Sequence, residues 1–217
     1  MNKKQALRIT LSLIGVLLIG FSISLSRVAN LGTDPFTTFN LGLSSFFDIQ
    51  FGTYMVISNA IGLIFVFLLA RHLIGIGTFF NIFLVGYVAD FGVGVITSQF
   101  GEISLLWLRI FLVVLSLVIL AAGAAMYIVA ARGIAPFDAI PIIVEERTNG
   151  KVSFQTARVV TDILAIGIGL AFGATLGVNT LVSGFFMGPL IQFFRTKFST
   201  LLEDLESPKT EMENNCI

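Results

Sequence analysis

The chain has 217 residues, of which 56% are apolar and only 12% are charged, and its mean hydropathy is +0.95. A soluble domain usually carries about 25% charged residues because its surface faces water, so this composition excludes an ordinary soluble protein and predicts an integral membrane protein. The formal net charge is zero, which removes the electrostatic case for a nucleic-acid partner.

Apolar runs that are long enough to cross a bilayer recur along the chain. A bilayer core needs roughly 20 helical residues, and six runs approach that length when a turn of polar residues is added at their ends. They are Leu7–Leu25, Tyr54–Ala70, Ile74–Ile96, Leu105–Ala131, Val159–Phe172 and Leu176–Phe194. The sequence therefore predicts an all-α transmembrane bundle of about six spans, with the lipid bilayer as its surroundings.

Lys3 and Lys4 precede the first run and Arg8 lies at its start, and such a basic flank is also typical of signal peptides. The run is long for the apolar part of a signal peptide, and no small-x-small cleavage pattern follows it. Because positively charged flanks stay on the cytoplasmic side, we expect a retained helix that starts in the cytoplasm.

Two further apolar segments, Phe36–Phe47 and Phe137–Val144, are too short to cross a bilayer. At 1.5 Å per residue, a helix of twelve residues covers only about 18 Å of a core that is about 30 Å thick. We therefore predict two re-entrant segments or half-helices, which are tolerated at membrane depth where protein or a wet cavity surrounds them.

Both short segments begin in the same way. Gly32 precedes Pro35 by three residues, and Gly133 precedes Pro136 at the same spacing. Gly allows a sharp turn, and Pro suits the first position of a helix because its missing N–H would be unpaired there anyway. These residues predict two half-helix starts that present the positive ends of their dipoles inside the membrane, as in transporters with broken helices.

Three polar residues lie at these starts. Thr37 and Asp138 occupy equivalent places just inside the two half-helices, and Asp34 precedes the first one. We take all three as candidates for a substrate or ion pathway. The alternative is an ordinary helix cap and turn, because Asp34 alone would cap the first half-helix well.

Arg158 and Asp162 lie four residues apart, in a run that reaches membrane-spanning length only if its helix starts near Ser153. Helical geometry places the two side chains on one face, where they can pair. An ionisable group within the bilayer is a candidate functional site, and the alternative is a structural ion pair that holds the bundle together. Asn59 is a further polar candidate in a predicted span.

Asp90 lies about two-thirds of the way along its predicted span, in a segment rich in glycine. Because intramembrane carboxylates often serve proton or ion pathways, Asp90 is the last pathway candidate. The alternative is a carboxylate at the outer membrane interface.

The two halves of the chain resemble each other, with one unit at about 7–98 and a second at about 104–198. The Gly-x-x-Pro-Phe segments recur 101 residues apart, and Gly75-Ile76-Gly77-Thr78 aligns with Gly177-Val178-Asn179-Thr180. If each unit has three spans and a re-entrant segment, the second copy is inverted, whereas a spanning short segment would make the copies parallel. Segment length and the distribution of basic residues favour inversion.

We assign 1–198 to a single membrane domain and 199–217 to a polar, acidic tail, with both termini in the cytoplasm. The chain has one His and one Cys, no Gly-x-x-x-x-Gly-Lys-Ser/Thr loop and no Gly-x-Ser-x-Gly elbow. It therefore offers no ordinary zinc site, nucleotide motor or hydrolase nucleophile. We expect no metal, no cofactor and no enzymatic activity.

Several segments together resemble a bacterial family, the YczE/YyaS/YitT-type membrane proteins, and the YczE-like branch most closely. The resemblance runs from about Leu7 to Phe194. The segments that carry it include Gly32-Thr33-Asp34-Pro35-Phe36, Gly75-Ile76-Gly77-Thr78, Gly133-x-x-Pro136-x-Asp138, Arg158-x-x-x-Asp162 and Gly188-Pro189-Leu190. Phe36-Thr37 departs from the aromatic–acid pair of the family, and Asp162 stands where Glu is common. The resemblance implies a multi-span protein of the bacterial plasma membrane.

We expect a small-molecule permease or exporter with its site near the membrane midplane between the two units. In this hypothesis Arg158 would hold an anionic group and a carboxylate would couple to protons. The second hypothesis is a non-transporting accessory protein that anchors or regulates a complex through the acidic tail and the loop at 145–151. A third hypothesis, an intramembrane enzyme, has no nucleophile–base pair to support it.

Overall fold

The computed structural model describes residues 3–206, and all regular structure in that range is helical. The elements are α1 (Lys3–Ala29), α2 (Pro35–Phe46), α3 (Phe51–Leu69), the 3₁₀ turn η1 (Arg71–Leu73), α4 (Ile76–Phe100), α5 (Leu106–Ala130), α6 (Pro136–Arg147), α7 (Phe154–Ala171) and α8 (Val178–Glu206). The predicted all-α fold is confirmed.

Five helices of the described range are long and apolar enough to cross a membrane, namely α1, α3, α4, α5 and α7. The helix α8 is longer still, at 29 residues, but its second half is polar. The helix α7 begins at Phe154 with Ser153 as its N-cap. This is the start that the predicted span around Arg158 requires.

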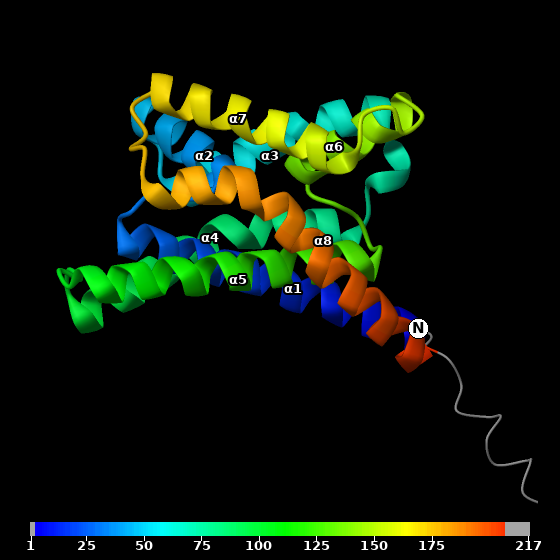
Figure 1. The fold of residues 1–217 in the computed structure, drawn as a ribbon, viewed down its shortest axis with the longest axis horizontal. Helices are drawn as coiled ribbons and strands as arrows, with labels where there is room; N and C mark the ends of the chain where they lie inside the picture. Colours follow the sequence, from blue (N-terminus) through cyan, green and yellow to red (C-terminus); the bar gives the residue numbers. More distant parts are fainter. Residues whose placement is uncertain (1–2, 207–217) are drawn as a thin grey trace, which may run out of the picture.

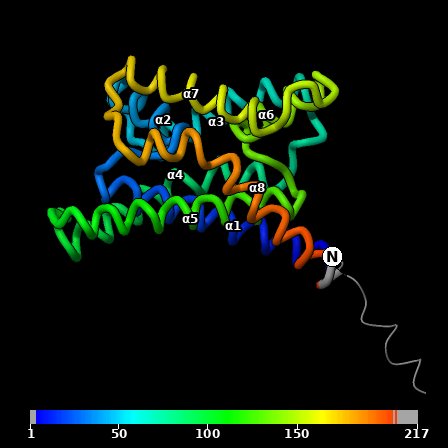
Figure 2. The backbone as a smooth tube through the Cα atoms, in the orientation of Figure 1, coloured from blue at the N-terminus to red at the C-terminus, as the bar shows by residue number. Residues whose placement is uncertain are grey.

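The helices form two layers with α8 crossing between them (Figure 1). One layer contains α1, α4 and α5, and the other contains α2, α3, α6 and α7; Figure 2 shows the same path as a tube. The helices α1 and α5 approach closely through Gly15 and Gly123. A Cβ atom added to Gly15 would lie 2.6 Å from the carbonyl oxygen of Gly123, so only a residue without a side chain allows this packing distance.

The short helices α2 and α6 do not cross the bundle. The chain turns inward after α1 through Asn30 and Gly32, which have φ angles of 49° and 92°, and α2 then starts at Pro35. The end of α2 returns to the end of the bundle where α7 finishes, because Phe46 packs edge-on against Phe172 at 5.0 Å.

The helix α6 mirrors this path at the opposite end of the bundle. It begins at Pro136 and finishes where Glu146 accepts a hydrogen bond from His72 in η1, at 3.2 Å. The first turns of α2 and α6 meet in the middle, where the rings of Phe36 and Phe137 stack with centroids 4.5 Å apart. The predicted half-helices are therefore present, and their N-terminal ends face each other.

Each loop that leads into a half-helix is held by the start of a long helix from the other half of the chain. The N–H of Gly77 donates to the carbonyl of Arg132 at 2.7 Å, and the N–H of Asn179 donates to the carbonyl of Leu31 at 3.0 Å. The hydroxyl of Thr78 also donates a hydrogen bond to the carbonyl of Ile134. In the other loop, the hydroxyl of Thr180 accepts a hydrogen bond from the N–H of Thr33. The two Gly-x-x-Thr segments thus serve as clamps on the half-helix starts.

The predicted tail differs from the structure at its beginning. The helix α8 continues beyond Ser199 to Glu206, and Leu202 is only 5% exposed. The apolar side chain of Leu202 packs against the bundle, which extends the helix past the predicted boundary. The rest of the predicted tail, from 207 to 217, lies outside the described residues.

Candidate functional site

The candidate site lies where the half-helices α2 and α6 begin. Asp34 is the N-cap of α2, and its carboxylate accepts a hydrogen bond from the N–H of Thr37 at 3.0 Å. Pro35 occupies the first helical position, where its ring imposes a helical φ angle. The expected capping role of Asp34 is therefore observed, and its side chain also lines an internal cavity.

Asp138 lies in the first turn of α6, where Ala135 leaves the helix without a side-chain cap. Its carboxylate accepts hydrogen bonds from the hydroxyl of Tyr127 on α5 and from the guanidinium of Arg158 on α7. Tyr127 is completely buried. Three helices therefore converge on this one carboxylate.

Arg158 connects the acidic residues of the site. Its Nε donates to Asp162 at 3.1 Å, which is the pair expected from the spacing of four residues, and a terminal nitrogen donates to Asp138. Its guanidinium carbon lies 5.2 Å from the ring centroid of Phe137. The side chain of Arg158 is 8% exposed and that of Asp162 is fully buried, so this ion pair lies within the protein interior.

The site carries more negative than positive formal charge. Asp138 and Asp162 both contact one guanidinium, and Asp34 lines the same small cavity as Asp138 and Arg158. The two half-helix ends add about half a positive charge each, which still leaves a deficit of roughly one. In addition, Oδ1 of Asp162 is buried without a hydrogen-bond partner.

A small internal cavity of about 50 Å³ adjoins these residues. Its polar lining consists of Asp34, Asn81, Asp138 and Arg158, and its apolar lining includes Phe36 and Phe137. A polar space of this size holds a few water molecules or a small charged group. Asn81 and Tyr127 were not among the site residues predicted from the sequence. Their signal was present nonetheless, because a polar amide or a lone tyrosine within an apolar span needs a buried partner.

Two predicted residues lie away from this cluster. Asp90 pairs with Arg27 at 2.6 Å and accepts a hydrogen bond from the N–H of Gly52 at 2.9 Å, so it stabilises the first turn of α3. Asn59 on α3 donates to the carbonyl of Met55 at 2.9 Å and lines a separate, apolar groove. The structure therefore groups Asp34, Thr37, Asp138, Arg158 and Asp162, and it separates Asp90 and Asn59 from them.

The fold and the site together define a polytopic membrane protein with a charged centre between two half-helices. The chain belongs to the family of unknown function DUF6198, whose profile matches residues 6–196. The resemblance inferred from the motifs is thereby confirmed.

The chain is similar to three curated bacterial proteins. It is 25% identical to the uncharacterized membrane protein YczE of Bacillus subtilis over 194 residues, which cover 89% of this chain and 87% of that protein. It is 27% identical to the uncharacterized protein YyaS of the same organism over 184 residues, covering 83% and 89%. It is 24% identical over 188 residues to an uncharacterized protein of Haemophilus influenzae, covering 86% and 82%. No solved structure matches the chain.

Proposed function

We propose that this protein is a secondary transporter of the bacterial plasma membrane whose site is the charged cavity between α2 and α6. The observation that carries the proposal is the convergence of two half-helix N-termini on a buried ionisable cluster, since a charge at membrane depth is costly and marks ion or substrate pathways. A purely structural pair would need one acid for Arg158. The site has three.

The charge balance favours a cation or a proton as the ligand of this site. Both Asp138 and Asp162 already engage Arg158, so its guanidinium is less free to hold an anion than the sequence hypothesis assumed. The excess of carboxylates over the one guanidinium instead favours a positive or hydrogen-bond-donating species.

Two further hollows lie toward the ends of the bundle. One, of about 310 Å³, is lined by Arg27, Thr33 and Thr38, and Thr33 adjoins Asp34. The other, of about 600 Å³, is lined by Glu145 at the end of α6, by Arg195 on α8 and by other residues of α7 and α8.

We propose further that the halves are inverted copies. Backbone positions 101 residues apart share left-handed conformations: Asn30 and Ala131, Gly32 and Gly133, and Asp48 and Asn149. The helices α1 and α5 run in opposite directions, because Arg109 near the start of α5 donates to the carbonyl of Ala29 at the end of α1, at 2.6 Å. With the positive-inside rule, the end of the bundle that bears Arg71 and Arg195 is cytoplasmic, as are both termini.

The proposal is tested with purified protein in proteoliposomes. We expect the wild type to carry an alkali cation or a primary ammonium ion coupled to an imposed pH gradient, followed with an internal pH dye. Asp138→Asn and Asp162→Asn should abolish this flux because they remove the negative charge of the site. Asp48→Asn is the matched control, since Asp48 is exposed at the end of α2. Flux equal to that of empty vesicles for the whole panel would contradict transport.

A non-transporting accessory role is the second candidate, and one observation favours it. The last turns of α8 carry several charged residues and lie beside the N-terminal end of α1 (Figure 1), which offers a surface for a cytoplasmic partner. Removal of residues 207–217 separates the two functions. Transport that persists without these residues argues against a role that depends on the tail.

A further inference from the structure

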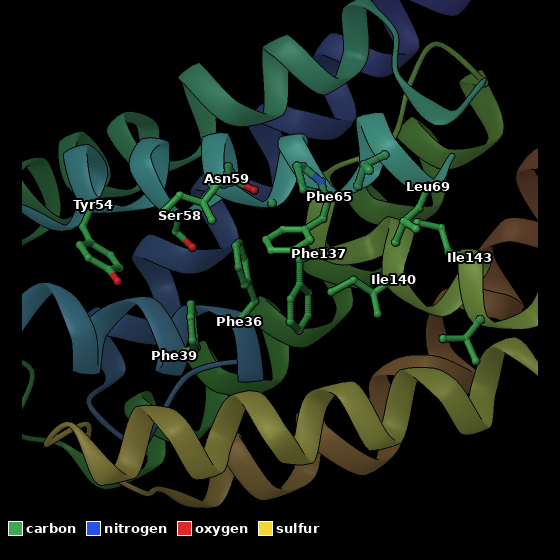
Figure 3. Close-up of a pocket in the computed structure, with 15 residues that line it drawn as sticks. Phe36, Phe39, Tyr54, Ser58, Asn59, Phe65, Leu69, Phe137, Ile140 and Ile143 are labelled. Carbon is green, nitrogen blue, oxygen red and sulfur yellow. The ribbon is translucent and has the colours of Figure 1, made fainter. Parts of the chain in front are cut away.

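An apolar groove of about 490 Å³ lies between α2, α3 and α6, beside the charged cavity. Figure 3 shows aromatic and aliphatic side chains around it, among them Phe36, Phe39, Phe137 and Ile140. Asn59 is the main polar exception. Asn59 is only 1% exposed, and its buried Oδ1 atom has no hydrogen-bond partner.

The groove opens toward the lipid. The helix α3 is a candidate span, and its groove-lining residues Ile61 and Phe65 are 54% and 61% exposed. Apolar side chains exposed along a membrane-spanning helix face acyl chains rather than water. The half-helices α2 and α6 form the opposite side of the groove, and Ile140 on α6 is also exposed to 41%. A molecule dissolved in the bilayer can therefore reach this groove without passing through an aqueous vestibule.

Phe36 and Phe137 separate the groove from the charged cavity. They are the two residues that line both spaces, and their rings stack with centroids 4.5 Å apart. Phe137 also carries the guanidinium of Arg158 over its ring. Behind this pair of rings lie the carboxylates of Asp34 and Asp138.

We propose that the Phe36–Phe137 stack is a lateral gate through which an amphipathic organic cation enters from the bilayer. Its apolar chain occupies the groove, and its ammonium group reaches Asp34 and Asp138. This inference deepens the proposed function, on which its transport aspect rests. It names the class of substrate and the side from which the substrate arrives.

Charge complementarity selects a cation over other amphipathic molecules. The carboxylates behind the gate exceed the single guanidinium, and the faces of aromatic rings attract cations. The unpartnered Oδ1 of Asn59 in the groove accepts hydrogen bonds, which an ammonium group supplies and a sulfonate group does not. The cavity of about 50 Å³ restricts the charged group to a small one such as a primary ammonium.

Access is tested with dicyclohexylcarbodiimide, a lipid-soluble reagent that modifies buried carboxyl groups, on the full chain in lipid nanodiscs. We expect mass spectrometry to locate the adduct on Asp34 or Asp138. Dodecylammonium at ten times its Kd should slow labelling about tenfold by occupying the site, whereas dodecanesulfonate, with the same chain, should not. Equal protection by both would show that an acyl chain alone fills the groove, and it would overturn the inference.

The gate itself is tested by substitution. Phe137→Ala should accelerate labelling by dicyclohexylcarbodiimide, and Phe111→Ala, a lipid-facing change on α5, should leave the rate unchanged. A water-soluble carbodiimide that labels the wild type as fast as the lipid-soluble one would overturn the lateral route. If Phe137→Ala does not fold, the comparison of the two amphiphiles on the wild type still decides the question.

These outcomes distinguish the inference from the proposed function. If dodecylammonium protects the carboxylates but the protein moves no solute, the binding site and its lateral gate are supported and the transport role is contradicted. Transport of a water-soluble cation without protection by dodecylammonium would keep the transport role and overturn the lateral gate.

Discussion

Arg158 is the residue on which the electrostatics of the bundle interior depends. It lies between Asp138 and Asp162 and over the ring of Phe137. Burying a charge is tolerated where partners with good geometry surround it, and removing one member leaves the others uncompensated. The fully buried carboxylate of Asp162 is the residue most affected by such a change.

Arg158→Ala should therefore lower the free energy of unfolding by about 3–5 kcal/mol, because it leaves buried carboxylates without a counter-charge. Arg158→Lys should recover only part of this loss, since an ammonium group lacks the planar fork that reaches two carboxylates. Thermal unfolding in detergent, followed by far-UV circular dichroism, measures both. An unchanged melting temperature for Arg158→Ala would show that the acids bind protons instead of needing the arginine.

The half-helices are stable as elements because other elements support their ends. A helix of twelve residues is marginal by itself, and the loops before α2 and α6 are held by α8 and α4. These contacts are too close for side chains. A Cβ atom on Gly177 would lie 2.0 Å from the carbonyl oxygen of Leu31, and one on Gly75 would lie 2.2 Å from that of Arg132.

Gly177→Ala should destabilise the protein by about 1–3 kcal/mol, because overpacking at a backbone contact forces the half-helix start to shift. Gly94→Ala is the matched control. A Cβ atom on Gly94 meets nothing within 4 Å, so this change should be neutral or stabilise α4 by up to about 1 kcal/mol. Melting temperatures of the two variants in the same detergent test the difference. Similar values would show that the clamp is not under strain.

At the scale of the whole molecule, the bundle has two distinct ends and a charged centre. Arg27, Asp90 and Arg109 gather at one end, and His72 and Glu146 meet at the other. Neither half contains the whole candidate site. Asp34 comes from the first half, and Asp138, Arg158 and Asp162 come from the second, so the two halves contribute unequally to the site.

The inverted arrangement predicts opposite accessibility for Arg71 and Gln99, which follow α3 and end α4. In a Cys216→Ser background, Arg71→Cys should react with a membrane-impermeant maleimide from the cytoplasmic side only, and Gln99→Cys from the outer side only. Labelling of intact cells against inverted membrane vesicles measures this. The reverse pattern would indicate parallel copies with spanning short segments.

The sequence by itself determined the class of protein, the long helices and the half-helix starts, because composition, run length and the Gly-x-x-Pro spacing are local properties. It also determined the Arg158–Asp162 pair, since four residues bring two side chains to one helical face. Tertiary structure alone decided that Asp138 accepts hydrogen bonds from Arg158 and from Tyr127. It also decided that Asp90 pairs with Arg27 and not with this cluster.

The physical reason is that contacts between helices depend on how they cross and on which loops exchange hydrogen bonds. The hydrophobic periodicity of a single helix indicates neither how that helix crosses its neighbours nor which loops bond to each other. The half-helices therefore emerged from their lengths, whereas the meeting of their N-terminal ends at Phe36 and Phe137 emerged only when the helices were packed. The groove and the cavity on either side of that pair of rings are products of the same packing.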